Sequence, residues 1–170
     1  CRYDAMFFII FQIIGGAVAV FIMQMLMGKI LTDAPVNSAA TVPGKFGVMG
    51  SLITELIIAF ITMSMVLFTS NNNKLKRFTR LFAGCLVCTW VLVAAPMSGF
   101  GMNPARSFAS AFPSGIWNSF WIYLFIPFVG MLLAAEFYLF VERNKVNSHY
   151  PNKKIQSHKN KFIEPLEFIL

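Results

Sequence analysis

The residues best suited to chemistry in this chain stand in a row, Asn103-Pro104-Ala105-Arg106. Asparagine is a favoured N-cap and proline is favoured at the first helical position, so the pair predicts that a helix begins here. As the cap, Asn103 would accept hydrogen bonds from first-turn amides through its side-chain oxygen, which leaves its NH2 donors free to point outward. Arg106 adds a fixed positive charge near the positive end of the helix dipole. Such a tip can donate hydrogen bonds to small neutral molecules and repel cations.

The flanking residues predict a re-entrant loop at 98–113, one that enters a membrane without crossing it. A helix ended by Pro113 would have about nine residues and reach about 13 Å, roughly half a bilayer. Non-helical backbone at membrane depth persists only where it is buried in protein or lines a water-filled cavity. We therefore expect a polar path lined by the carbonyl groups of the extended stretch before the helix. That stretch consists of Gly99, Phe100, Gly101 and Met102.

The composition places this loop in a membrane protein. Hydrophobic residues make up 57% of the 170 positions and charged residues 12%, whereas a soluble domain has about 45–50% and about 25%. Nine of the charged residues lie at Glu142 or beyond, so the body has even fewer. This disfavours a soluble enzyme, a disordered chain and a disulfide scaffold. The predicted fold is an all-α membrane protein.

Four stretches approach or exceed the roughly 20 apolar residues that cross a bilayer. They are residues 5–28, 46–69, 81–97 and 116–141. The sequence thus predicts four transmembrane helices plus one re-entrant half-helix, followed by a basic tail at 142–170.

Lysine and arginine indicate which ends of the helices are cytoplasmic. Eleven of the 14 basic residues fall at the chain start, in the loop after the second span and in the tail, against Lys29, Lys45 and Arg106 on the other side. We therefore expect a multi-pass protein with a cytoplasmic C-terminal tail. Since the basic residues flank hydrophobic spans, the net charge of +7 reflects topology, and no nucleic-acid partner is expected.

Other chemistry finds little support in the sequence. Cys85 and Cys88 form a C-x-x-C pair among apolar residues without a nearby histidine or acidic residue, so we favour packing over a metal or redox site. Neither a cofactor nor a metal is expected. The spans contain no nucleophile–base pair, which argues against an enzyme. A secondary transporter with a broken-helix substrate site is the alternative to a channel, and it would need a coupling carboxylate or ion site beside the break.

The segment Met102-Asn103-Pro104-Ala105-Arg106-Ser107-Phe108 closely resembles the second Asn-Pro-Ala box of the aquaporins, the major intrinsic proteins. Glu55 is placed like the family's buried glutamate that accepts hydrogen bonds from the re-entrant loop, and Gln12 resembles the glutamine of the third family helix. Pro127 and Gly130 resemble residues near the middle of the sixth helix. The resemblance covers residues 3–142.

This resemblance implies six spans and two half-helices in inverted repeats, with one pore per subunit of a homotetramer. Residues 1–141 would be a partial channel domain that supplies the third to sixth spans and the second half-helix. The paired-asparagine constriction needs the other half-helix, so these 170 residues are expected to be part of a longer channel and not to conduct alone. The expected function is passive passage of water and small neutral solutes such as glycerol, with ions and protons excluded.

The resemblance also implies a selectivity filter that includes Val91, Phe100 and Arg106. Strict water channels usually carry histidine where this chain has Val91, and an aromatic residue at the position of Phe100 resembles the glycerol facilitators. Ser107 and Ala111, in contrast, resemble the water-channel group. The implied filter is therefore of mixed type.

Overall fold

The computed structural model describes residues 2–149, which form helices, turns and loops without a strand. The helices in chain order are α1 (Arg2–Met27), α2 (Lys29–Thr32), η1 (Asn37–Ala39), α3 (Gly47–Ser70), η2 (Lys76–Phe78), α4 (Thr79–Val93), α5 (Ala95–Ser98), α6 (Pro104–Ser114) and α7 (Phe120–His149). The predicted all-α class is confirmed. Most of the predicted tail, residues 150–170, lies outside the described residues.

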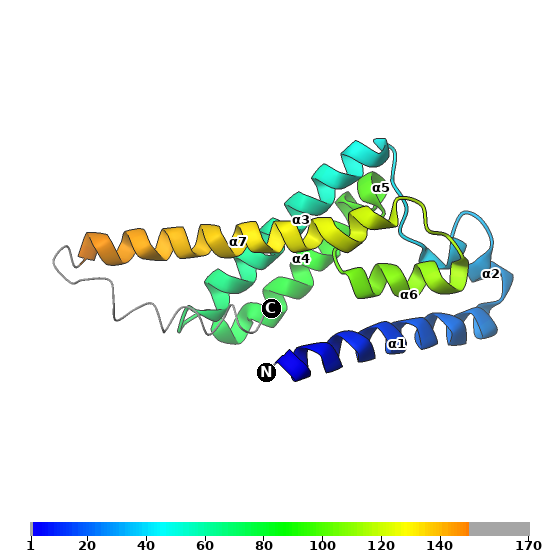
Figure 1. The fold of residues 1–170 in the computed structure, drawn as a ribbon, viewed down its shortest axis with the longest axis horizontal. Coiled ribbons are helices and arrows are strands. Elements are labelled where there is room, and N and C mark those ends of the chain that lie inside the picture. Colours follow the sequence, from blue (N-terminus) through cyan, green and yellow to red (C-terminus); the bar gives the residue numbers. More distant parts are fainter. Residues whose placement is uncertain (1, 150–170) are drawn as a thin grey trace.

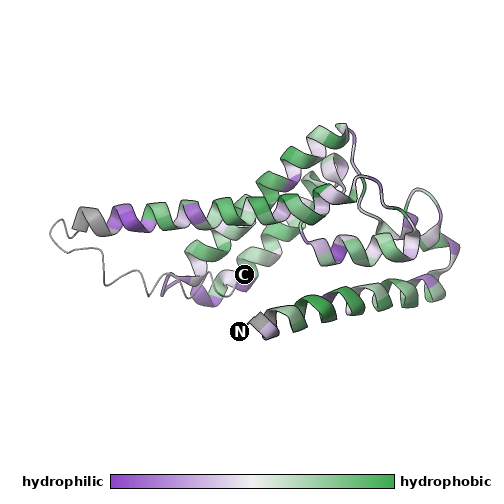
Figure 2. Cartoon of the chain, in the orientation of Figure 1, coloured by the Kyte–Doolittle hydropathy of each residue, from purple (hydrophilic) through white to green (hydrophobic). Residues whose placement is uncertain are grey.

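Three helices within the described range are long and apolar enough to cross a membrane: Met6–Met27 in α1, Gly47–Ser70 in α3 and Phe120–Lys145 in α7. Figure 2 shows hydrophobic residues along all three, with hydrophilic residues concentrated near helix ends and in loops. Large apolar side chains such as Phe11 and Phe140 are exposed on the outside of the bundle. Because exposure of this kind is costly in water but not in lipid, the chain is an integral, multi-pass membrane protein.

The predicted third span, 81–97, is interrupted. Helix α4 ends at Val93 and the short helix α5 follows at Ala95–Ser98, with Pro96 in its first turn. Proline has no amide hydrogen and its ring crowds the carbonyl four residues earlier, so a continuous helix through residue 96 is disfavoured. Helix α4 alone has 15 residues, fewer than a span needs.

Three other predicted boundaries also differ from those of the structure. Helix α6 runs to Ser114 with Pro113 inside it, and it ends because Gly115 adopts a left-handed conformation with φ 70°. The last helix begins at Phe120, after Ser119 with φ 52°, and not at 116. It continues to His149, beyond the expected boundary at 141.

Two close helix contacts organise the bundle. Helix α3 crosses α7, and a Cβ on Gly130 of α7 would lie 2.8 Å from the Leu56 carbonyl oxygen of α3. Helix α1 packs on α6, where a Cβ on Gly16 would lie 2.7 Å from that of Ala109. Figure 1 shows the resulting arrangement, with α6 between α1 and the start of α7. Small residues thus permit the backbone approach that stabilises helix pairs in lipid.

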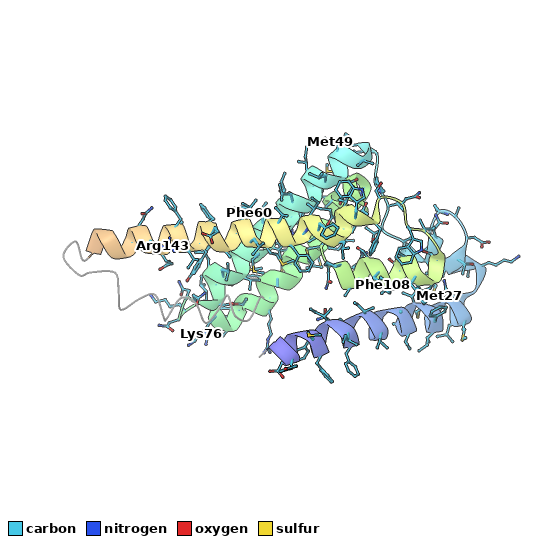
Figure 3. The ribbon with its side chains drawn as sticks, in the orientation of Figure 1. Met27, Met49, Phe60, Lys76, Phe108 and Arg143 are labelled. Atoms are coloured by element: carbon cyan, nitrogen blue, oxygen red, sulfur yellow. The ribbon has the colours of Figure 1, made fainter. Side chains whose placement is uncertain are left out.

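Basic residues of two separate segments lie at one end of the bundle. Figure 3 shows Lys76, in the loop after α3, and Arg143, near the end of α7, at the same end of the molecule. Met27 lies toward the opposite end, and Met49 lies at the upper tip of α3. The loop between α3 and α4 and the C-terminal part of α7 therefore lie at the same end of the bundle.

Candidate functional site: the re-entrant loop

The start of α6 has the geometry of a capped helix. Asn103 has an extended backbone (φ −137°, ψ 120°), and its Oδ1 accepts a hydrogen bond from the Ala105 amide at 2.9 Å. Pro104 occupies the first helical position, where its missing N–H costs nothing. The Asn103 side chain is exposed in this chain. Its amide nitrogen therefore remains available to donate.

A buried carboxylate holds the backbone before this cap. Glu55 of α3 is fully buried. Its Oε1 accepts hydrogen bonds from Ser98 Oγ at 2.7 Å and from the Gly101 amide at 2.8 Å, and its Oε2 accepts one from the Met102 amide at 2.7 Å. A buried charge without such partners would cost several kcal/mol. The three donors thus fix the loop and satisfy the carboxylate at once.

Two residues of this loop have strained backbones. Phe100 and Met102 have φ values of 53° and 52°, in the left-handed region that non-glycine residues seldom adopt. Each such residue costs on the order of 1 kcal/mol or more, and it persists only where the surroundings determine it. The Phe100 amide donates to Ser98 Oγ at 3.2 Å. Side-chain acceptors therefore maintain this loop in place of the helical hydrogen bonds that it lacks.

Tyr123 of α7 closes the loop from the other side. Its side chain is fully buried, and its hydroxyl donates to the Ser98 carbonyl oxygen at 2.7 Å. A Cβ on Gly101 would lie only 2.5 Å from the Tyr123 ring. Glycine is therefore required where the loop passes between α3 and α7.

Arg106 is held by both the loop and the segment before α3. Its guanidinium donates to the Phe100 carbonyl oxygen and, at 3.2 Å, to Thr41 Oγ1. It also lies 5.3 Å from the centre of the Phe100 ring, within the range of a cation–π contact. The position of the positive charge is therefore set by three groups from two segments far apart in sequence.

Asn103 and Arg106 open onto a cleft of about 380 Å³ between α1, α6 and the turn at η1. The cleft is lined by Gln12, Gly16, Val20, Ser38, Ala39, Asn103, Ala105, Arg106, Ala109 and Ser110. The lining includes polar side chains from each of these elements, among them Gln12, Ser38 and Asn103. A small molecule in this cleft would meet hydrogen-bond donors next to a fixed positive charge.

The structure brings together some of the predicted site residues and separates others. Gln12, Asn103, Ala105 and Arg106 share the cleft. The Phe100 side chain instead packs in a buried cluster with Ile58 and Ala94. Val91 is 48% exposed on α4 and is not among the residues that line the cleft.

Two of the carbonyl groups predicted to face a pore accept hydrogen bonds from residues of the loop and its half-helix. The Phe100 carbonyl accepts from Arg106, and the Gly101 carbonyl accepts from the Asn103 amide at 2.6 Å. These two oxygens are engaged within the loop, because the tight turns at residues 99–103 direct them toward their own segment. The roles predicted for the remaining positions stay predictions.

Several residues that build the site were missed from the sequence. Ser98, Thr41 and Ser51 are buried polar residues at this end of the bundle, and Ser51 Oγ accepts from the Gly44 amide at 3.3 Å. Only Ser98 had a signal in the sequence, since a serine just before the Gly-rich stretch can accept hydrogen bonds from its backbone. Thr41 carries no such signal, since its loop reaches Arg106 only in the folded bundle.

The described part of the chain contains no candidate metal site. No group of three or more His, Cys, Asp or Glu side chains there is close enough to hold an ion. Cys85 and Cys88 are free thiols exposed on α4. The packing role expected for them stays a prediction.

These features define a class of protein: an all-α membrane protein with a half-helix that begins inside the bundle, at an asparagine that caps it. A family model described as major intrinsic protein matches residues 2–138. The chain therefore belongs to the major intrinsic protein family, which confirms the resemblance seen in the sequence. The family is one of membrane channels and not of enzymes.

Individual relatives agree with this assignment. The chain is 32% identical over 135 residues to aquaporin TIP2-1 of Arabidopsis thaliana, covering 78% of this chain and 52% of that protein. It is 31% identical over 129 residues to probable aquaporin TIP4-1 of Oryza sativa subsp. japonica (75% and 49%) and 30% identical over 132 residues to aquaporin NIP1-1 of Zea mays (77% and 45%). The chain thus spans about half the length of the curated relatives that it matches.

Proposed function

We propose that this chain supplies the second pore loop of a passive transmembrane channel for water and small neutral solutes such as glycerol. The observation that carries the proposal is the position of Asn103. It caps a half-helix that starts inside the bundle, and it faces the cleft beside Arg106. The relatives that match the chain are described as aquaporins.

Selection would follow from the electrostatics of this tip. A neutral solute that accepts hydrogen bonds can exchange its water shell for the donors of Asn103 and Arg106. A cation would lose hydration and meet both the guanidinium and the positive end of the α6 dipole. The same charges would raise the barrier for protons. Exclusion of ions and protons is therefore part of the proposal.

The range of solutes depends on the remaining wall of the pore. Val91 offers no hydrogen bond where strict water channels of the family usually have histidine. The Phe100 ring is packed away from the cleft, and its loop position therefore contributes little aromatic surface there. We include glycerol because of Val91, with water as the principal permeant.

The assembly and orientation form a second part of the proposal. We propose a homotetramer embedded in lipid, with the end that carries Lys76 and Arg143 facing the cytoplasm (Figure 3). The C-terminal tail would then be cytoplasmic. The basic residues at this end support the orientation through the positive-inside rule.

A secondary transporter is less well supported, because coupling needs an ionisable group that can change its partners. Glu55 is the buried carboxylate nearest the break, and its two oxygens already accept three hydrogen bonds from the loop. The deciding experiment is stopped-flow swelling of proteoliposomes that contain the full-length protein. Faster water entry than in empty vesicles, and glycerol uptake that is independent of ion gradients, would support the channel. Swelling no faster than in empty vesicles would refute it.

A further inference from the structure

The side chain of Met102, the residue before Asn103, takes part in a hydrogen bond of its own. Thr62 Oγ1 on α3 lies 3.8 Å from Met102 Sδ, to which it donates a hydrogen bond. The same hydroxyl oxygen accepts a hydrogen bond from the indole Nε1 of Trp90 on α4, at 3.0 Å. A chain of polar contacts therefore runs from α4 through α3 to the pore loop.

The direction of the Thr62 hydroxyl is unusual for a threonine in these helices. The hydroxyls of Thr54, Thr69 and Thr89 donate to the carbonyl four residues earlier in their own helices, at 2.8, 2.8 and 3.0 Å. A hydroxyl has a single hydrogen. When the Thr62 hydroxyl donates to Met102, that hydrogen is not available to its own helix.

Trp90 also supports the loop by packing. Its ring lies against the buried cluster of Ile58, Ala94 and Phe100, and Met102 packs against the same cluster. The main chain of Met102 is strained, with φ 52°, and its amide is bound to Glu55. Two residues of α3 thus hold Met102: Glu55 binds its backbone amide, and Thr62 binds its side chain.

We infer that Thr62 and Trp90 are positioning residues that lock Met102 and thereby set the direction of Asn103 in the pore. The inference rests on the proposed channel function. Glu55 fixes the amides of Gly101 and Met102 but not the Met102 side chain. The Trp90–Thr62 pair adds a polar anchor to the packing of that side chain against the cluster, so that Asn103, the next residue, presents its donors to solutes in one orientation.

The test uses the full-length protein with the double substitution Thr62→Val and Trp90→Phe. A single Thr62→Val change leaves the indole N–H without a partner and endangers folding, whereas removing both polar groups avoids that penalty. Thr69→Val is the matched control, because Thr69 lies on the same helix and its hydroxyl binds only its own turn. Thr62→Ser, which retains the hydroxyl, is the conservative variant.

Two measurements are made on each variant. Hydrogen–deuterium exchange of the peptide covering residues 99–103 measures how well the backbone amides of the loop are protected. Proteoliposome swelling gives the ratio of water to glycerol permeability. In the double variant we expect exchange to rise, and the permeability ratio to fall, by about fivefold each, the size expected for one neutral hydrogen bond. Thr69→Val and Thr62→Ser should keep the parent values.

Any other result would contradict one specific part of the inference. Unchanged exchange in the double variant would show that the pair does not hold the loop. Raised exchange with an unchanged permeability ratio would show that the pair supports the loop but does not position Asn103. If the parent protein conducts no water, the proposed channel function is wrong and the filter role falls with it. The exchange measurement, which needs no conduction, still decides whether the pair holds the loop.

Discussion

The carboxylate of Glu55 accepts a hydrogen bond from the main-chain amide of Met102 at 2.7 Å, although the two residues are 47 positions apart. This contact joins the middle of a transmembrane helix to the residue that precedes the capping asparagine. The backbone at residues 99–103 has no helical ladder of its own. Its geometry therefore depends on an acceptor supplied by another helix.

Replacing Glu55 should mainly affect folding. In Glu55→Ala the amides of Gly101 and Met102 and the Ser98 hydroxyl lose their acceptor, and unpaired buried donors cost about 1–3 kcal/mol each. We expect a much lower yield of monodisperse protein in detergent and a lower Tm. The matched control is Glu136→Ala, since Glu136 is an exposed carboxylate on α7. A stable Glu55→Ala protein with altered selectivity would contradict the prediction.

Arg106→Ala should relax the exclusion of cations or protons. The substitution removes the fixed charge beside the cleft and its contact with Thr41, whereas Arg106→Lys retains a charge. Proton leak can be followed with a pH-sensitive dye trapped in proteoliposomes. We expect a leak in the alanine variant and a smaller one in the lysine variant. A leak equal to that of the parent in both variants would remove Arg106 from the filter.

Val91→His should favour water over larger solutes. The imidazole would add bulk and hydrogen-bonding groups at the position where the resemblance places part of the filter. We expect glycerol permeability in vesicles to fall by several-fold while water permeability changes little. Equal glycerol flux in parent and variant would show that residue 91 does not border the pathway.

Gly101→Ala should destabilise the loop. The new methyl group would lie 2.5 Å from the Tyr123 ring and 3.2 Å from Glu55 Oε2, and overpacking of this kind costs about 1–3 kcal/mol. Gly15→Ala is the control, because a Cβ there has no atom within 4 Å. We expect a lower Tm only in the Gly101 variant. Equal Tm values would mean that the loop can shift away from Tyr123 without cost.

Local rules predicted the start of the half-helix because they depend on neighbours in the chain. Asn103 and Pro104 are a cap and a first helical residue in any context, and the structure shows that cap. Helix ends were less predictable. Pro113 is accommodated in the last turn of α6, where Gly115 provides the stop, and Pro96 divides a stretch that hydropathy alone presents as continuous.

The sequence by itself determined that this chain is an α-helical membrane protein with a re-entrant half-helix and an Asn-Pro-Ala-Arg tip, because hydropathy and capping are properties of short segments. Only the tertiary structure decided which groups hold that tip. Glu55, Tyr123 and Thr41 reach it from three separate segments, and the Phe100 ring turns into the core. Strained backbone has no periodic signal in a sequence. Its conformation is fixed by partners that come into contact only after the helices have packed.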